Sequence, residues 1–308
     1  MNSVGIDISK GRSTIAVMRP FGEVAISPFE VRHTDSELSE LARRLKSLNG
    51  ETRVVMEATG NYHAPVAKQL HDAGLYVSVV NAKLVHGYGN NDLRRVKTDR
   101  KDAIKLANYG LDRWLTLPRY IPEENTRLLL KNCYRQYRQY SKVQTVLKNN
   151  LISLLDMTFP NANRLFNSPA RADGSEKWVD FVAEFWHCEC VSERPLKSFV
   201  NKYWRWCRKH GYNFSEEKAH AIYDEASGHI GVMPKSETTK LLVEQAVSQL
   251  SATSAALAVL KQEMQSLSSQ LPEYPVVMDM FGVGPTLGPQ LIAEIGDVRR
   301  FYSKKALV

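Results

Sequence analysis

The strongest constraint on the fold is an apolar repeat in the last third of the chain. Nine positions alternate at spacings of three and four residues, and only one of them is polar: Val243, Ala246, Leu250, Thr253, Leu257, Leu260, Met264, Leu267 and Leu271. This pattern predicts a helix over residues 236–271 that buries a narrow seam against another helix. The partner is either the stretch at 127–155, in an antiparallel hairpin, or a second copy of the chain in a coiled coil.

The first 120 residues instead show the pattern of an α/β unit. Short alternating or β-branched runs predict strands at 4–8, 14–18, 24–31, 53–56 and 76–80, and helical spacing predicts helices at 36–48, at 64–73 and from about residue 98. This order fits a mixed sheet with helices on its faces. We therefore expect an α/β domain at 1–155, a Trp-rich and mainly helical insertion at 156–235, the long helix at 236–271, and a separate segment at 272–308.

Composition narrows the range of partners and compartments. Lys and Arg total 41 against 33 Asp and Glu, which gives a net charge of +8 and favours a polyanionic partner. The longest purely apolar run covers only residues 255–260, so we expect no membrane span. Charged residues interrupt the N-terminus, and the four cysteines are irregularly spaced. A cytoplasmic protein without a disulfide framework is the expectation.

Four acidic residues stand where the predicted sheet could bring them together. Asp7 lies mid-strand opposite the apolar face, Glu57 ends the fourth strand, and Asp99 and Asp102 are spaced i,i+3 on one helix. Four adjacent carboxylates repel one another, and Mg²⁺, which prefers oxygen ligands, would remove that repulsion. Two such ions would support phosphodiester chemistry. The alternative is that these acids are merely solvated. Nearby cations favour a site for metal and phosphate together: Arg94, Arg95, Lys97, Arg100 and Lys101.

The same segments resemble a known family. The sequences GIDISK at 5–10, MEATGNY at 56–62 and KTDRKDA at 97–103 are together similar to the DEDD transposases of the IS110 family, which includes Piv-type DNA invertases. The resemblance implies an RNase H/RuvC-like fold in which Asp7, Glu57, Asp99 and Asp102 are catalytic Mg²⁺ ligands. It also implies DNA recombination, a structured guide RNA as a partner, and a homo-oligomer formed through the coiled coil.

One departure from the family pattern qualifies this expectation. Family members carry a serine nucleophile in a C-terminal transposase domain, and this sequence reaches Val308 where that domain is only beginning. Ser303 is not in the matching context. We therefore expect either a transposase that lacks its serine segment or a non-catalytic remnant that still binds nucleic acid.

A basic stripe is the clearest candidate for nucleic-acid contact. Cations recur at helical spacing with no acid between residues 124 and 156: Arg127, Lys131, Arg135, Arg138 and Lys142. Phosphates favour such a stripe, and the interleaved Tyr134, Tyr137 and Tyr140 could either stack on bases or pack on the sheet. The alternative is an ordinary solvated face, although such faces usually mix charges.

Two further motifs have competing interpretations. Gly282 and Gly284 lie between two short predicted helices, as in half of a helix-hairpin-helix, where backbone N–H groups could contact a phosphate. An ordinary glycine turn is the alternative. Cys188, Cys190, Cys207 and His210 suggest zinc, but the C-x-C spacing is tighter than usual and tryptophans surround it. Cysteines packed in an apolar core are the favoured interpretation.

Overall fold

A computed structural model describes residues 1–88, 98–301, 303 and 305. It divides into two compact units, Met1–Pro122 and Glu123–Val308. The predicted first domain extended to residue 155, whereas the structure assigns the helix after residue 124 to the second unit. The reason is packing, because this helix runs along the long C-terminal helix rather than on the sheet. No helix in the described part of the chain is long and apolar enough to cross a membrane.

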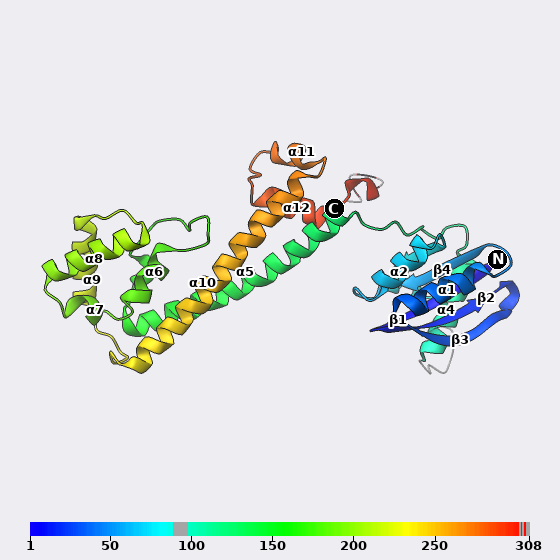
Figure 1. Cartoon of the computed structure of the whole chain (residues 1–308), viewed down its shortest axis with the longest axis horizontal. Coiled ribbons are helices and arrows are strands. Elements are labelled where there is room, and N and C mark those ends of the chain that lie inside the picture. Colours follow the sequence, from blue (N-terminus) through cyan, green and yellow to red (C-terminus); the bar gives the residue numbers. More distant parts are fainter. Residues whose placement is uncertain (89–97, 302, 304, 306–308) are drawn as a thin grey trace. The chain divides into compact units, whose positions relative to one another are not determined.

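The first unit is a five-stranded mixed sheet flanked by helices (Figure 1). The strands lie in the order β3-β2-β1-β4-β5: β1 (Asn2–Ser9), β2 (Arg12–Met18), β3 (Val24–Arg32), β4 (Thr52–Glu57) and β5 (Tyr76–Val80). The first three strands are antiparallel, and β4 and β5 run parallel to β1. This is the arrangement of an RNase H/RuvC-like sheet, and it confirms the predicted fold class.

Helices cover the two faces of this sheet differently. Helices α1 (Asp35–Lys46) and α2 (His63–Asp72) pack on the face that carries Val4, Ile6 and Ile8. Helix α4 (Asp99–Asp112) packs on the opposite face, next to the short helix α3 (Ala82–His86). A 3₁₀ turn, η1 (Pro20–Gly22), connects β2 and β3. The face that alternates with the apolar residues of β1 therefore lies under α4.

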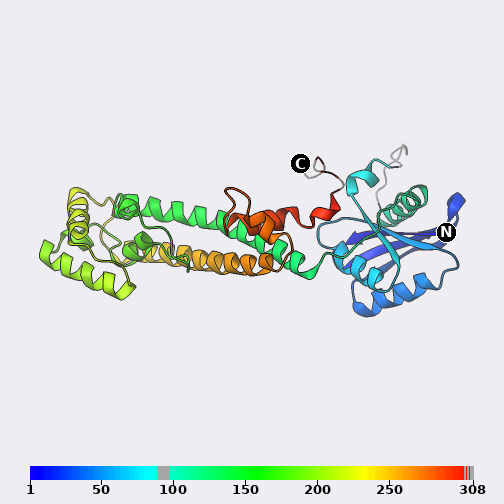
Figure 2. The same ribbon diagram turned by 90° about the horizontal axis from the view of Figure 1, so that it is seen from above.

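The second unit is organised by two long antiparallel helices, α5 (Asn125–Thr158) and α10 (Glu237–Ser269), which lie side by side in Figures 1 and 2. Leu130 shares an apolar cluster with Met264, whereas Leu151 shares another with Leu250. Between these clusters the Gln144 Nε2 donates a hydrogen bond to the Ser254 Oγ at 2.9 Å. The predicted seam is thus buried within the chain, as the hairpin interpretation required.

The seam departs from the ideal heptad pattern near its middle. Thr253 and Leu260 are only half-buried, whereas Ser254 is buried. The backbone of Gly174 lies against this turn, and a Cβ on that glycine would come within 2.4 Å of the Ser254 carbonyl oxygen. A small residue is therefore needed where the loop before α6 meets α10.

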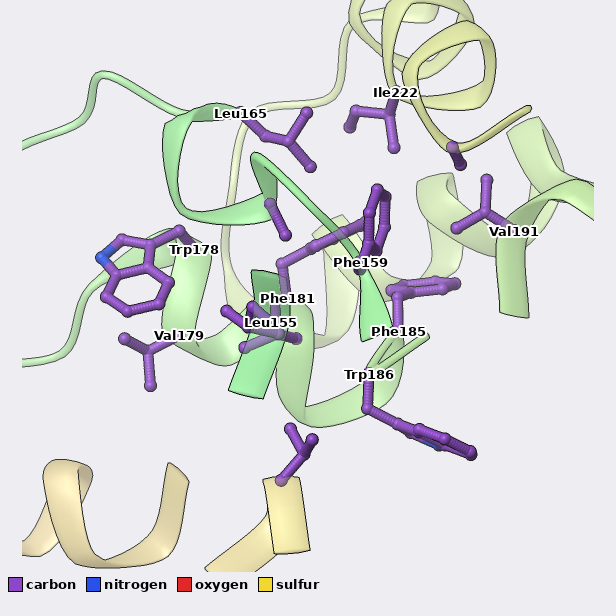
Figure 3. Packing of buried hydrophobic residues seen from close by; sticks show 14 of the residues in the cluster. Leu155, Phe159, Leu165, Trp178, Val179, Phe181, Phe185, Trp186, Val191 and Ile222 are labelled. Atoms are coloured by element: carbon purple, nitrogen blue, oxygen red, sulfur yellow. The ribbon is translucent and has the colours of Figure 1, made fainter. Parts of the chain in front are cut away.

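The segment between the long helices forms a helical module with an aromatic core. Its elements are η2 (Ala162–Arg164), α6 (Lys177–Glu184), α7 (Glu189–Ser192), α8 (Leu196–His210) and α9 (Glu216–Gly228). Figure 3 shows the cluster, in which Phe181 and Phe185 stack with ring centroids 4.6 Å apart. Cys188 and Cys207 are buried in the same cluster, and burial raises the pKa of the Cys207 thiol. The favoured interpretation of these cysteines as core residues is confirmed for this pair.

The C-terminal part packs against the start of α5. Helices α11 (Tyr274–Met278) and α12 (Leu287–Ile295) precede the 3₁₀ turn η3 (Val298–Arg300). Ile292 and Ala293 join Leu130 and Met264 in one apolar cluster. This packing anchors the segment at 272–301 to the helical hairpin.

Candidate metal and nucleic-acid site

Strand register places Asp7 beside Glu57. In the parallel pair β1–β4, Gly5 is opposite Val55 and Ile6 is opposite Met56, so Asp7 and Glu57 occupy the next position. Because opposite residues of paired strands point to the same face, both acids share the face of Gly5 and Val55. Both side chains are half-buried. The sheet therefore presents two neighbouring carboxylates where β1 and β4 end.

Helix α4 crosses this face in unusually close contact with β1. A Cβ on Gly5 would lie 2.0 Å from the carbonyl oxygen of Ala103 and 2.4 Å from the backbone nitrogen of Ala107. Farther along the helix, a Cβ on Gly110 would lie 2.3 Å from the Ser3 Oγ. The helix therefore runs antiparallel to β1, with its later turns over Ser3 and its middle over Gly5. Its first turn points toward the strand end that carries Asp7.

The first turn of α4 carries the other two acids. Thr98 caps the helix, since its hydroxyl accepts a hydrogen bond from the backbone N–H of Lys101, and the helix begins at Asp99 as predicted. Asp99 is exposed and Asp102 half-buried. Acids in the first turn also interact favourably with the positive end of the helix dipole. One end of one sheet face thus receives acids from three elements, β1, β4 and α4.

The carboxylates are not gathered into a closed ligand set. Within the described residues, no three His, Cys, Asp or Glu side chains meet closely enough to hold a metal ion. The structure thus brings the carrying elements together without bringing the four carboxylates to ligand distance. Their chemistry still fits a hard divalent cation, because all four donors are carboxylate oxygens. Arg100 and Lys101 are exposed on α4. Arg94, Arg95 and Lys97 lie outside the described residues.

The basic stripe on α5 differs from the prediction at its first member. Arg127 is 6% exposed, and its Nη2 donates a hydrogen bond to the Glu273 Oε2 at 3.0 Å. This ion pair raises the pKa of Arg127 and lowers the pKa of Glu273. The predicted nucleic-acid contact at Arg127 is therefore wrong, because the guanidinium is buried against a carboxylate from the start of α11.

The rest of the stripe remains at the surface. Lys131 pairs with Glu123 at 3.2 Å, and Arg138 lies 3.9 Å from Glu294. Arg135 and Lys142 are exposed, and in the described part of the chain neither has a carboxylate within ion-pair distance. The candidate phosphate-binding surface therefore reduces to Arg135, Arg138 and Lys142.

The interleaved tyrosines have a structural role. Tyr134 and Tyr137 pack against the cluster formed by α5, α10 and α12. The Arg138 guanidinium lies 5.7 Å from the centre of the Tyr134 ring. Of the two uses predicted for these residues, the structure favours packing on the protein, although on helices rather than on the sheet.

The glycine segment lies where it was predicted, between α11 and α12. Gly282 has a φ of +79°, which suits glycine, and no atom lies within 4 Å of a Cβ added to Gly282 or Gly284. The backbone N–H of Gly288 donates to the Gly284 carbonyl. The turn is thus open enough for a phosphate to approach, and its use as a nucleic-acid contact stays a prediction.

The residues that allow α4 to pack so close to the sheet were not predicted from the sequence. Gly5 and Gly110 permit the close approach, and neither was singled out. A signal was present, because glycine inside a strand often marks close contact with another backbone.

Comparison with known protein families identifies the chain. A model of the transposases whose acidic motif is DEDD matches residues 4–160, and a model described as "Transposase IS116/IS110/IS902 family" matches residues 274–308. The chain belongs to the IS110 family of transposases. The resemblance stated from its three motifs is thereby confirmed.

Individual relatives match more limited regions of this member of the IS110 family. The pilin gene-inverting proteins of Moraxella bovis and Moraxella lacunata are each 27% identical over 134 residues, which are 44% of this chain. The match spans only 38% of the length of those relatives. Two solved structures of Thermus thermophilus RuvC, one with a Holliday junction substrate, cover 39% of this chain and 99–100% of their own. Their sequence identities are 13% and 17%, with TM-scores of 0.29 and 0.26.

The exposed remainder of the basic stripe, Arg135, Arg138 and Lys142, gives a first testable prediction. Reversing two charges in the variant Arg135→Glu/Arg138→Glu should weaken binding of structured RNA or duplex DNA and flatten its dependence on salt by roughly two charge equivalents. Fluorescence anisotropy across a series of NaCl concentrations measures both. The matched control is Arg43→Glu/Lys46→Glu on α1, on the sheet face opposite Asp7. An unchanged slope in the stripe variant would show that the stripe is only a solvated face.

Proposed function

We propose that this IS110 transposase recombines DNA by Mg²⁺-dependent phosphodiester chemistry at Asp7, Glu57, Asp99 and Asp102. The observation that carries the proposal is the convergence of β1, β4 and α4, which bear these acids, at one end of one sheet face. Family membership supports it, because the segment that the transposase model matches, residues 4–160, contains all four residues. Since the substrate is DNA, we place its action in the cytoplasm.

The four acids have different positions and therefore different roles in the proposal. Asp7 and Glu57 are fixed by paired strands and would define the rigid half of the site. Asp99 and Asp102 lie on the first turn of α4, where a small shift of the helix would bring them toward the strands. Bound Mg²⁺ ions would supply activation of a nucleophile and stabilisation of the leaving oxygen. Arg100 and Lys101 would hold the phosphate backbone beside them.

Two partners other than DNA complete the proposal. A structured guide RNA would contact the surface of Arg135, Arg138 and Lys142 through its phosphates. A second copy of the chain would pack on the helical hairpin. Exposed apolar side chains along both helices, Val143, Val146 and Val259, support such a contact.

The experiment compares nicking of supercoiled plasmid DNA by the chain in Mg²⁺ and in EDTA. The proposal predicts nicking in Mg²⁺ and none in EDTA. The alternative function, a nucleic-acid-binding remnant, predicts a mobility shift of the plasmid in either buffer without nicking. DNA binding without metal-dependent cleavage would therefore replace the proposed function with that alternative.

A further inference from the structure

Helix α8 of the aromatic module carries a second basic surface. Residues 194–215 contain six Lys and Arg and no Asp or Glu. The buried side of α8 carries Phe199, Tyr203, Trp206 and Cys207. At 100° per residue the exposed residues fall within an arc of about 140° on the opposite side: Lys197, Ser198, Asn201, Trp204, Arg205, Arg208 and Lys209. One solvent-facing side of α8 is therefore cationic along its whole length.

A pocket marks the start of this face. It has a volume of about 650 Å³, and its charged lining consists of Arg194, Lys197, Lys202 and Arg205. Lys202 pairs with Glu184 at 3.4 Å. Within the described residues, Arg194, Lys197 and Arg205 have no carboxylate within ion-pair distance. Uncompensated cations around a hollow favour an anionic ligand with several phosphates.

One aromatic side chain distinguishes this face from a simple cationic patch. Trp204 is 41% exposed, whereas the other four tryptophans are at most 8% exposed. The Arg208 guanidinium lies 5.0 Å from the centre of the Trp204 ring. An exposed ring set among cations is the arrangement that stacks an unpaired base while the cations hold its backbone. A membrane-binding helix would present several large apolar residues, and Trp204 is the only exposed one within α8.

We propose that the exposed face of α8, comprising Arg194, Lys197, Asn201, Trp204, Arg205 and Arg208, binds single-stranded nucleic acid with one unpaired base stacked on Trp204. This surface is separate in sequence from the α5 stripe and from the acids of the sheet. The proposal assigns single-stranded nucleic acid as a ligand to the aromatic module between α5 and α10. The inference rests on the proposed function only in that both concern nucleic acid.

The test measures anisotropy of a fluorescein-labelled (dT)20 strand with the full chain. The variant Arg205→Glu/Arg208→Glu should bind about tenfold more weakly, and its log–log salt slope should fall by roughly 1.4, for two lost phosphate contacts. The matched control, Arg43→Glu/Lys46→Glu on α1, makes the same charge change in the first unit of the chain, whereas α8 belongs to the second. Equal weakening in both variants would overturn the proposal.

Trp204 provides a readout local to this surface. Adding (dT)20 should protect part of the tryptophan fluorescence from acrylamide, and the protected part should be absent in Trp204→Phe. Trp204→Ala should weaken binding of (dT)20 about fivefold or more and leave binding of the annealed (dT)20·(dA)20 duplex unchanged, whereas Trp204→Phe should restore most of the affinity. Acrylamide quenching that (dT)20 does not alter would contradict the stacked base.

Further outcomes distinguish this proposal from a membrane-binding surface and from the proposed recombinase activity. If Arg205→Glu/Arg208→Glu abolishes binding to phosphatidylserine vesicles but not to (dT)20, the ligand is a membrane surface and the proposal fails. If (dT)20 binding requires α8 but plasmid nicking never depends on Mg²⁺, the α8 surface stands and the proposed recombinase activity fails. If the α8 variant binds (dT)20 normally and plasmid nicking depends on Mg²⁺, the proposed recombinase activity stands and the α8 proposal fails.

Discussion

Replacing Asp7 with asparagine is expected to lower Mg²⁺-dependent plasmid nicking by about a thousandfold. Asp7 lies on the central strand of the sheet, beside Glu57. Because the paired strands fix its position, we expect no other side chain to take over its role as a ligand. Loss of one anionic ligand removes several kcal/mol of charge stabilisation from a metal-assisted transition state, and about 4 kcal/mol corresponds to that factor. Initial rates of plasmid nicking at saturating DNA measure the effect.

The control for this variant is Glu40→Gln. Glu40 lies on α1, on the opposite face of the sheet, where it pairs with Arg43 at the surface. Its replacement should leave the nicking rate unchanged, and circular dichroism should show that both variants keep the wild-type helix content. A rate for Asp7→Asn within threefold of wild type would exclude Asp7 from the metal site.

Replacing Gly5 with alanine is expected to destabilise the first unit by about 3 kcal/mol and lower its melting temperature by roughly 10 °C. The added Cβ would meet the backbone of Ala103 and Ala107 rather than a movable side chain. Relief therefore requires α4 to move as a whole. Because α4 carries Asp99 and Asp102, nicking should also fall in the fraction that remains folded at low temperature.

A second glycine supplies the comparison. Gly228 ends α9 with no atom within 4 Å of an added Cβ, so Gly228→Ala should change the melting temperature by no more than about 2 °C. Thermal unfolding followed by circular dichroism distinguishes the two variants. If Gly5→Ala melts like wild type, the close packing of α4 on β1 is incorrect.

Much of the fold follows from local sequence pattern. Alternation in β1 placed Val4, Ile6 and Ile8 on one face and Asp7 on the other, and the sheet keeps that division. The helix predicted from about residue 98 begins at Asp99, after the capping residue Thr98. The apolar seam predicted that α10 packs on a helix. These features were predictable because each depends on residues a few positions apart.

Long-range partners were not predictable from one sequence. Arg127 fits the α5 stripe by spacing, but its ion-pair partner Glu273 is 146 residues away. The basic face of α8 was overlooked because its tryptophans indicated a core, and only the fold separates the buried Trp206 from the exposed Trp204. The sequence motifs predicted which four acids belong together. The distance between the acids of α4 and those of the strands depends instead on how closely α4 packs over Gly5.

The most direct test of the central claim is calorimetric titration of the chain with Mg²⁺. Wild-type protein should bind the ion, and Asp99→Ala and Asp102→Ala should each abolish that binding while leaving the circular dichroism spectrum intact. This result would mean that acids from α4 and from the strands act on one ion. Unchanged Mg²⁺ affinity in both variants would contradict the shared site.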